Sequence, residues 1–368
     1  MKILHYVDEA NLAWGRPWMQ LILTLEKNGF ANTVLCPPGG ILSGFLKEHS
    51  VPAIYANAPL PWLPPLCHEV GWAIKRAAPD IIHTRLSSAA KIGGYWGKKL
   101  AVPVISTIDK YPKLKYYKNT NVAVGCSSAV TSHMIEAGFP EEQTVTIHNP
   151  VDGDFYRFNQ DERESFRARA GVGPEETVLL GLGRFIDWKA FDLLIKACSS
   201  IKHLPDWRLW LVGDGPDRQK LESMADRLGL RDKATFWGFA TDIRPFLWAS
   251  DLFIQPSNKP EGFSLAILEA MAAGLPAAAT TIGGTLDLLD GGGLFPFEVG
   301  DEGALAAILK NFFSLPREVR QKQGNEAVKS ASRFYLDAIA AKYGELYKKV
   351  RSFSFSKTSG SARPGGRP

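Results

Sequence analysis

Two carboxylates stand close to one short apolar segment in the second half of the chain. Ser264 is a good helix N-cap, the apolar residues after it recur at helical spacing, and Gly274 and Pro276 then end the helix. This helix contains a single carboxylate, Glu269, and Glu261 lies just ahead of its N-terminus. A buried carboxylate is costly unless it accepts strong hydrogen bonds, and the two hydroxyls of a ribose would supply them. The alternative is a buried glutamate that pairs with an internal arginine.

The N-terminus of this helix and a pair of cations indicate a diphosphate site. Free backbone N–H groups and the positive end of the helix dipole lie between the two glutamates. Arg184 and Lys189 are five residues apart in the loop after a predicted strand, residues 177–182. Fixed cations stabilise the negative charge that a departing nucleoside diphosphate gains. The alternative is two surface cations. A dinucleotide fingerprint would need a glycine at Ile186, which disfavours a dehydrogenase.

These residues carry a family resemblance. The pattern Glu-Gly-Phe-Ser-Leu-x-x-x-Glu-Ala-Met-Ala-x-Gly-x-Pro at residues 261–276 resembles the donor signature of retaining nucleotide-sugar glycosyltransferases of family four, which have the two-domain GT-B fold. The resemblance implies that Glu269 binds the donor ribose and that Glu261 binds hydroxyls of the transferred sugar. The loop with Arg184 and Lys189 is similar to the family's diphosphate motif, with Ala190 in place of the usual glycine. The further donor-binding residues that we expect are Gly262, Phe263, Ser264, Leu265, Gly213 and Phe239.

The first half of the chain matches the family more loosely, at the loops expected to face the acceptor. Gly15 and Arg16 stand where related transferases often have a Gly-Gly loop, and His83 and Arg85 follow another predicted strand. Asp109 occupies the place of a histidine that touches the donor sugar in the family. For each of these loops the alternative is ordinary turn chemistry. The catalytic set that the resemblance implies is Arg184, Lys189, Glu261 and Asp109.

Strands and helices alternate along the chain, which indicates an α/β protein with parallel sheets and ligands at the carboxyl ends of the strands. We predict a GT-B architecture of two Rossmann-like parallel-sheet domains that face a cleft. The 368 residues are long enough for two cores. The predicted domains are residues 1–160 for the acceptor and 172–335 for the donor, joined by a charged, helix-capable linker at 155–173. A C-terminal helix, 336–351, packs back on the first domain, and 352–368 is a disordered tail.

Composition limits the partners and the location. The net charge of +5 is mild and does not by itself argue for nucleic acid, and the four cysteines are scattered, as free thiols in a reducing compartment would be. The chain shows neither a signal peptide nor a convincing membrane span, so we expect a cytoplasmic protein, at most peripheral on the inner face of the membrane. Asp152 and Asp154 form an Asp-x-Asp in a turn, which is too short a pattern to indicate a metal. We therefore expect no metal and no cofactor besides the nucleotide sugar.

The segment from Lys110 to Lys118 interleaves basic and aromatic residues. Nucleic-acid binding is one interpretation, and a plain solvated loop is another. We favour a membrane-surface patch over RNA, because lysines meet anionic head groups while tyrosines lie at the interface. This loop and the segment 59–65, rich in proline and tryptophan, are then expected to approach a lipid-linked acceptor.

The sequence as a whole predicts a retaining glycosyltransferase. It would move a sugar from a nucleotide-diphosphate donor to a hydroxyl of a carbohydrate or lipid-linked acceptor, in lipopolysaccharide or other envelope polysaccharide biosynthesis. The alternatives are a sugar-nucleotide epimerase, a glycan phosphorylase and a subunit that binds sugar nucleotides without turnover. The donor sugar, the base, the acceptor and the linkage are not determined by the sequence.

Overall fold

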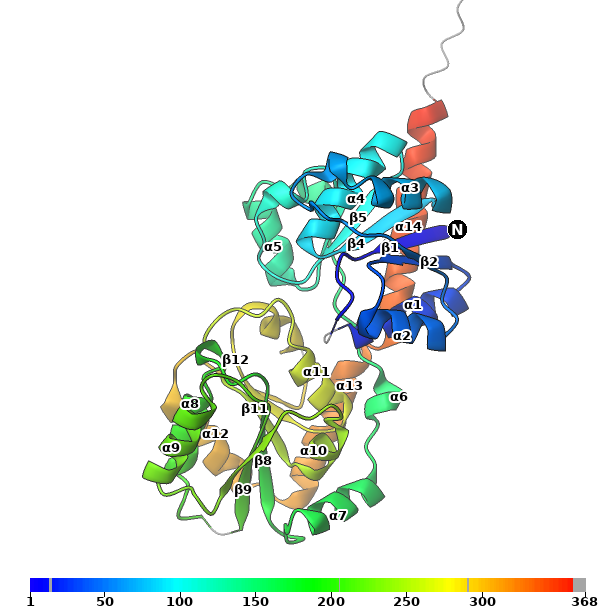
Figure 1. Ribbon diagram of the computed structural model, residues 1–368. Helices are drawn as coiled ribbons and strands as arrows, with labels where there is room; N and C mark the ends of the chain where they lie inside the picture. Colours follow the sequence, from blue (N-terminus) through cyan, green and yellow to red (C-terminus); the bar gives the residue numbers. More distant parts are fainter. Residues whose placement is uncertain (13–14, 205, 290, 360–368) are drawn as a thin grey trace, which may run out of the picture. The chain divides into compact units, whose positions relative to one another are not determined.

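A computed structural model describes residues 1–12, 15–204, 206–289 and 291–359 (Figure 1). The chain divides into two compact units: residues 1–150 together with the chain from Leu336 onward, and residues 151–335. In the described part of the chain, each unit contains one sheet in which every strand pair is parallel, with seven strands in the first unit and six in the second. The predicted pair of Rossmann-like α/β domains is confirmed.

The sheet of the first unit has the order β3-β2-β1-β4-β5-β6-β7. Its strands are β1 (Lys2–Tyr6), β2 (Ala31–Cys36), β3 (Ala53–Tyr55), β4 (Ile81–Arg85), β5 (Val104–Ile108), β6 (Val122–Gly125) and β7 (Thr144–Thr146). Its helices are α1 (Arg16–Lys27), α2 (Gly40–Glu48), α3 (His68–Ala77), α4 (Ser87–Leu100), α5 (Ser128–Glu136) and α14 (Leu336–Ser359). The chain leaves β3 at one edge of the sheet and returns to β4 beside β1, so the strand order reverses between β1 and β4.

The strands of the first unit are apolar on both faces because helices cover both faces. Ile3 and Ile81 share one buried cluster with residues of α1 and α14. Their neighbours in the chain, Leu4 and Ile82, point to the other face and join a cluster with residues of α3 and α4. Successive side chains of β1 and β4 therefore anchor two different helical layers.

Polar side chains tie α14 to the sheet inside the first unit. His83, on β4, shares hydrogen bonds with the hydroxyls of Tyr347 at 2.6 Å and Thr107 at 2.8 Å, and Thr107 also bonds the Tyr343 hydroxyl at 2.9 Å. The rings of His83 and His5 lie 5.5 Å apart. Burial lowers the pKa of His83 well below its ordinary value and lowers the pKa of His5 to about 4. Both rings are therefore neutral at pH 7.

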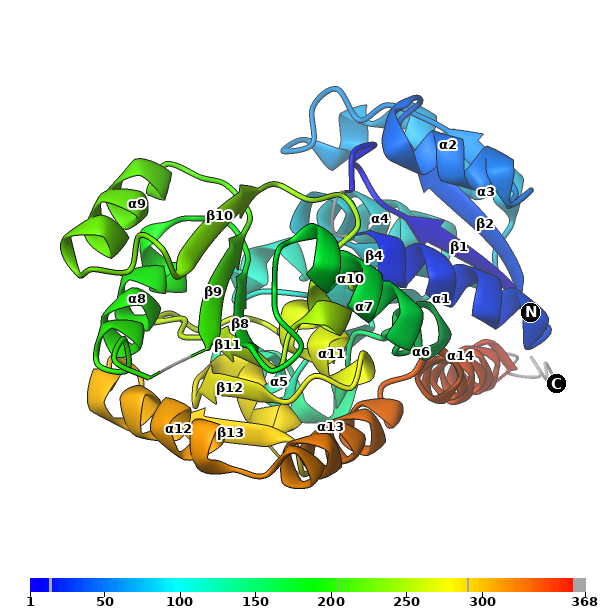
Figure 2. The same ribbon diagram turned by 90° about the horizontal axis from the view of Figure 1, so that it is seen from below.

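The sheet of the second unit has the order β10-β9-β8-β11-β12-β13, and Figure 2 shows β9, β8, β11 and β12 side by side. Its strands are β8 (Thr177–Leu182), β9 (Trp207–Val212), β10 (Ala234–Gly238), β11 (Leu252–Gln255), β12 (Ala277–Thr280) and β13 (Leu294–Phe297). Its helices are α6 (Gly153–Tyr156), α7 (Gln160–Arg169), α8 (Phe191–Ser199), α9 (Arg218–Arg227), α10 (Arg244–Ala249), α11 (Leu265–Ala272), α12 (Glu302–Ser314) and α13 (Arg317–Ser332).

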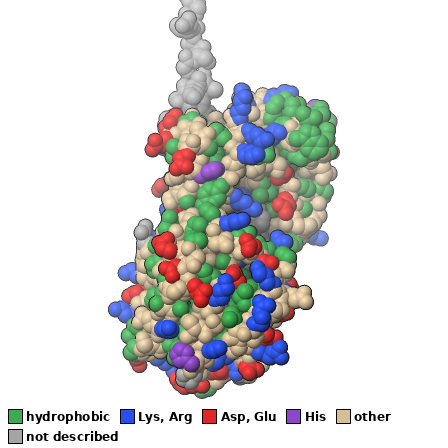
Figure 3. Space-filling view, turned by 90° about the vertical axis from the view of Figure 1, so that its left-hand side faces the viewer, with side chains coloured by type: hydrophobic (Ala, Val, Ile, Leu, Met, Phe, Trp, Pro, Cys, Tyr) green, Lys and Arg blue, Asp and Glu red, His purple; other side chains and the backbone are tan. Residues whose placement is uncertain are grey.

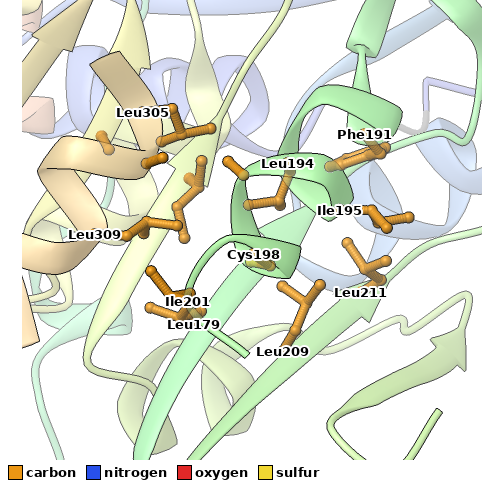
Figure 4. Close-up of a cluster of buried hydrophobic side chains, with 14 of the residues drawn as sticks. Leu179, Phe191, Leu194, Ile195, Cys198, Ile201, Leu209, Leu211, Leu305 and Leu309 are labelled. Atoms are coloured by element: carbon orange, nitrogen blue, oxygen red, sulfur yellow. The ribbon is translucent and has the colours of Figure 1, made fainter. Parts of the chain in front are cut away.

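One face of this sheet packs against α8 and α12. Figure 4 shows Leu179 and Leu209 of the strands meeting Leu194 and Cys198 of α8, with Leu309 of α12 in the same buried cluster. These side chains are fully buried. Burial raises the pKa of the Cys198 thiol far above its ordinary value, so this cysteine behaves as a small hydrophobic side chain.

The structure corrects two boundaries predicted from the sequence. The segment treated as a linker forms α6 and α7 and belongs to the second unit, which begins at Val151 rather than 172. The reason is a cluster of ionic contacts: Arg163 and Arg167 both pair with Asp251 and donate to backbone carbonyls near it. The second correction concerns the predicted tail, because α14 continues through residues 352–359. Residues 360–368 lie outside the described part of the chain.

Among the described residues, no helix combines the length and the apolar character that a bilayer crossing requires.

The buried histidines predict a pH dependence of stability. Because the folded-state pKa values of His5 and His83 lie below the unfolded value, the unfolded state binds more protons as the pH falls below about 6.5. The free energy of unfolding of the first unit should therefore decrease between pH 7 and pH 5, by up to about 1.4 kcal/mol per pH unit for each histidine. This free energy can be measured at each pH by urea titration, with hydrogen exchange of the α14 amides reporting the unfolding of the first unit. His83→Gln should reduce this slope, and an unchanged slope would contradict the assignment.

Candidate functional site

The candidate donor site lies where the strand order of the second sheet reverses. The chain passes from β8 through β9 to β10 at one edge and then returns to β11 beside β8. The loops after β8 and β11 therefore leave adjacent strands at their carboxyl ends, which is where open parallel sheets bind ligands. Lys189 stands in the first loop and Glu261 in the second, and the Lys189 Nζ donates to Glu261 Oε1 at 2.8 Å. The structure thus brings together two residues of the predicted catalytic set.

Three donors converge on one oxygen of Glu261. Besides Lys189, Gln255 Nε2 donates to Oε1 at 3.0 Å and Ser257 Oγ donates to it at 2.8 Å. The side chains of Lys189 and Glu261 are only 13% and 15% exposed, so solvent screens this ion pair weakly. An ammonium has three N–H donors, and Glu261 uses one of them. The pair therefore holds the Lys189 ammonium in place, and this group can still donate to an anion.

Gln255 connects this ion pair to the N-terminus of α11. Its amide nitrogen donates to Glu261 while its amide oxygen accepts a hydrogen bond from Ser264 Oγ at 2.8 Å. Ser264 is the N-cap of α11, as predicted, and its Oγ also accepts from the backbone N–H of Ile267. Gln255 and Ser257 were not among the residues predicted from the sequence. A polar residue that ends an apolar strand was the signal that could have identified Gln255.

Glycines let backbone approach backbone around this site. The N–H of Gly284 donates to the carbonyl of Glu261 at 2.9 Å, and a Cβ at Gly284 would lie 1.9 Å from the carbonyl oxygen of Gly262. A Cβ at Gly213 would likewise lie 1.9 Å from the carbonyl oxygen of Gly183, and Gly213 has a φ of +138°. The loops after β8 and β9 can pack this closely only because Gly213 has no side chain.

Glu269 has a hydroxyl partner that the sequence analysis did not name. The Tyr156 hydroxyl donates to Glu269 Oε1 at 2.8 Å. Tyr156 lies on α6 and is buried, and its carbonyl accepts a hydrogen bond from Trp248 Nε1 at 3.0 Å. Glu269 is half-buried on α11, eight residues after Glu261 in the chain. The tyrosine therefore holds one carboxylate oxygen of Glu269 in place.

Two further predicted residues stand at the same edge of the second sheet. Arg184 directly follows the glycine after β8; its side chain is exposed and has no hydrogen-bond or ion-pair partner among the described residues. Phe239 directly follows β10 and is 77% exposed. An unpaired guanidinium and an exposed ring are suited to an anion and to a flat aromatic group, respectively. Gly262, Phe263 and Ser264 are buried, while Leu265 is half-buried at the start of α11.

Asp109 and Arg85 form part of a closed network in the first unit. Arg85 Nε pairs with Asp109 Oδ2 at 3.2 Å, Arg85 Nη2 donates to Asn149 Oδ1 at 2.6 Å, and Asn149 Nδ2 donates to Asp109 Oδ1 at 3.1 Å. Arg85 is 5% exposed, whereas Asp109 is 24% exposed. Asp109, which follows β5, is thus the more accessible of the two. The buried Arg85 holds its carboxylate in place.

The structure gives His83 a structural position rather than the predicted acceptor-facing one. It is buried, and both ring nitrogens bond the hydroxyls that tie α14 to the sheet. Gly15 is buried at the N-cap of α1, where a Cβ would lie 2.6 Å from the Cβ of Leu12. Arg16 is exposed as the first residue of α1. Ala13 and Trp14, which precede Gly15 in the same loop, lie outside the described part of the chain.

The described residues contain no group of three or more histidine, cysteine, aspartate or glutamate side chains that could hold a metal ion. Asp152 is the N-cap of α6, where it accepts from the N–H of Phe155 at 3.0 Å, and Asp154 pairs with Arg157. The Asp-x-Asp pattern is therefore used for helix capping and a surface ion pair.

Comparison with known proteins identifies the class. Residues 16–155 match the family model "Glycosyltransferase Family 4", and residues 162–330 match "Glycosyl transferases group 1". The chain belongs to this family of glycosyltransferases. It is 31% identical to the lipopolysaccharide core biosynthesis glycosyltransferase LpsE of Rhizobium meliloti, over 94% of this chain and 98% of that protein. It is also 31% identical to LpsD of the same organism, over 95% and 98% of the two chains.

Solved structures confirm the GT-B fold. The chain superposes on Anabaena HepE in complex with UDP with a TM-score of 0.84 at 23% identity, over 95% of this chain and 100% of that one. A glycosyltransferase from Rickettsia africae gives the same TM-score and identity, over 95% and 98% of the two chains.

The close approach at Gly213 predicts a large cost for one methyl group. Gly213→Ala should lower the free energy of unfolding by at least about 2 kcal/mol, because the new Cβ meets the Gly183 carbonyl and the backbone angle is unfavourable. Gly303→Ala is the matched control: it lies in α12, and its Cβ would meet only an Asp301 oxygen at 3.5 Å. Urea unfolding followed by circular dichroism compares the two. Equal stability of both variants would contradict the packing described for the loops after β8 and β9.

Proposed function

We propose that the protein is a retaining, hexosyltransferase-type glycosyltransferase that uses a nucleotide-diphosphate sugar and a carbohydrate or lipid-linked acceptor. The observation that supports this most strongly is the Lys189–Glu261 pair, held by Gln255 and Ser257 where the strand order of the second sheet reverses. Charged groups fixed beside a helix N-terminus suit a substrate that is both anionic and rich in hydroxyls.

In this proposal the second unit binds the donor. Lys189, Arg184 and the N–H groups at the start of α11 receive the diphosphate, and Glu269 binds the ribose with the help of Tyr156. Phe239 is available to stack on the base, and Glu261 accepts from hydroxyls of the sugar. The complexes of Anabaena HepE with UDP and with UDP-glucose support a nucleotide-sugar donor.

The proposed reaction needs no nucleophilic side chain. The bond between the anomeric carbon and the diphosphate oxygen breaks with both electrons going to oxygen, and the acceptor oxygen forms its bond to the same face of the sugar. The acceptor proton passes to the departing diphosphate. Lys189 and Arg184 lower the barrier because they stabilise charge that grows on the leaving oxygen. We assign Asp109, oriented by Arg85, to the sugar contact, and we propose that no metal is required.

We place this reaction in lipopolysaccharide core or related envelope polysaccharide synthesis, on the cytoplasmic face of the membrane. The two Rhizobium meliloti relatives with that printed role support the pathway. Lys110, Lys113, Lys115 and Lys118 are exposed, as a contact with anionic head groups requires, although Tyr117 of the same segment is buried against Ser87.

Removing the donor contacts should reduce turnover strongly. Lys189→Ala and Glu269→Ala should each lower kcat/KM by about 10²-fold or more, because each removes a charged contact to the donor. The measurement is nucleotide release from a panel of nucleotide sugars that includes UDP-glucose. Near-native rates in both variants would contradict the donor site.

The matched control for this experiment is Lys196→Ala, which removes a lysine of the same unit that pairs with Asp192 on the half-exposed surface of α8. It should leave the rate unchanged. Tyr156→Phe keeps Glu269 but removes one donor to it, so a smaller loss is expected than for Glu269→Ala. EDTA should not change the wild-type rate. Binding of nucleotide sugars without release from any of them would favour a non-catalytic binding subunit.

The stereochemistry of the product tests retention separately. An α-linked donor such as UDP-glucose should give an α-glycosidic product, because the acceptor attacks the face from which the diphosphate leaves. The coupling constant of the anomeric proton in the NMR spectrum of the product distinguishes the two anomers. A β-linked product would show inversion and would exclude front-face displacement.

A further inference from the structure

Large hydrophobic side chains are exposed together in one part of the first unit. Trp72 is 71% exposed and Trp62 is 61% exposed. Tyr55, Leu63 and Leu66 are each exposed by nearly half. The group is formed by Tyr55, Trp62, Leu63, Leu66 and Trp72. Single exposed hydrophobic residues are ordinary, but a contiguous patch marks a binding surface. Figure 3 shows a dense hydrophobic patch on the first unit with lysine or arginine side chains beside it.

The fold holds these side chains outward. The inner face of α3 is buried through Val70 and Ile74, which pack in the cluster shared with α4. Trp72 therefore lies on the outer face of α3, one turn after His68, whose ring is 6.5 Å away. The segment with Trp62 is fixed as well, because Lys91 Nζ of α4 donates to the Trp62 carbonyl at 2.7 Å. The backbone that carries both tryptophans is therefore held by buried packing and by this hydrogen bond, and both side chains are mostly exposed.

The same surface is strongly basic. Lys75 and Arg76 follow Trp72 by three and four residues on α3, and Lys98 and Lys99 end the neighbouring helix α4; all four side chains are exposed. Lys99 also lies 4.9 Å over the ring of Trp96. Among the described residues 55–79 and 86–101, the one acidic side chain is Glu69, and its carboxylate accepts from the N–H of Asn57 at 2.9 Å. Exposed tryptophans beside exposed lysines are typical of groups that lie at a lipid–water interface.

We propose that this aromatic–basic face, made of Tyr55, Trp62, Leu63, Leu66, Trp72, Lys75, Arg76, Lys98 and Lys99, binds the surface of an anionic lipid bilayer. The tryptophans and leucines enter the head-group region, and the lysines and arginine contact anionic head groups. The inference locates the membrane contact of the proposed function on β3, the segment 59–66, α3 and α4, rather than on the segment 110–118. It rests on the proposed function only in that a membrane-bound enzyme suits a lipid-linked acceptor.

A protein partner fits this face less well. A second copy of the chain would bring the same basic groups opposite each other, because a two-fold interface pairs one patch with itself. Lysine is also depleted in the cores of protein–protein interfaces. Charge complementarity therefore favours an anionic bilayer over another copy of the chain.

Vesicle flotation tests the proposal with the full chain. Vesicles of phosphatidylglycerol and phosphatidylethanolamine should carry the wild type upward, whereas phosphatidylcholine vesicles should not. Trp62→Ser with Trp72→Ser should abolish most of this binding, and Lys98→Glu with Lys99→Glu should weaken it by about fivefold or more for each lysine lost. Phe158→Ser and Lys310→Glu are the matched controls, because both residues are exposed on the second unit, and they should bind as the wild type does.

The outcomes separate this proposal from the proposed function. Nucleotide release in detergent-free solution should stay at the wild-type rate in all four face and control variants, and each should keep the thermal midpoint of the wild type. The proposal would be overturned if both face variants floated with anionic vesicles to the same extent as the wild type. A second outcome would also overturn it. In that outcome neither the wild type nor any variant binds lipid, and the face variants lose a self-association that the wild type shows in sedimentation. Loss of flotation only when Lys113, Lys115 and Lys118 are changed to glutamate would place the contact on the segment 110–118 instead.

Discussion

The arrangement of the second unit depends on one ion pair, between Lys189 and Glu261. A carboxylate this shielded needs several donors, and it receives them from residues on β11, from the segment after it and from the loop after β8. Gln255 then extends the same chain of hydrogen bonds to the N-cap of α11. Because these groups come from adjacent parallel strands, the sheet itself sets their separation. The fold itself therefore holds the charged groups of the candidate site in place, as charge stabilisation in the proposed reaction would require.

The backbone around this pair is as constrained as its side chains. The approach of Gly284 to Gly262 and of Gly213 to Gly183 leaves no room for a methyl group. These contacts hold the loops after β8, β9, β11 and β12 against one another. Gly213 and Gly262, which the sequence predicts to bind the donor, are thus also needed for the packing of these loops. Both roles fall at the carboxyl edge of the sheet.

Much of this could be predicted from the sequence, because short-range signals determine it. The bounds of β8, β11 and β12 follow from apolar runs between turns, and Ser264 is recognisable as a cap. What could not be predicted depends on partners far away in the chain. Tyr156 and Glu269 are 113 residues apart, and His83 and Tyr347 are 264 apart, so no local pattern could show that the first pair meets or that His83 is buried. The sequence also places the start of the second unit too late, because α7 is polar in sequence and its partner Asp251 is more than 80 residues away in the chain.

The position of α14 in the first unit has a consequence for synthesis. Ile339, Tyr343 and Tyr347 complete the buried face of a sheet whose strands all precede residue 150. During translation the second unit leaves the ribosome entire while the first still lacks this helix, and the cluster of Ile3, Ile81 and Ile105 lacks its α14 partners until residues 336–359 emerge. The unit that is made first is thus the last to be finished. The cell must keep an open apolar sheet from aggregating for as long as about 185 intervening residues take to be translated.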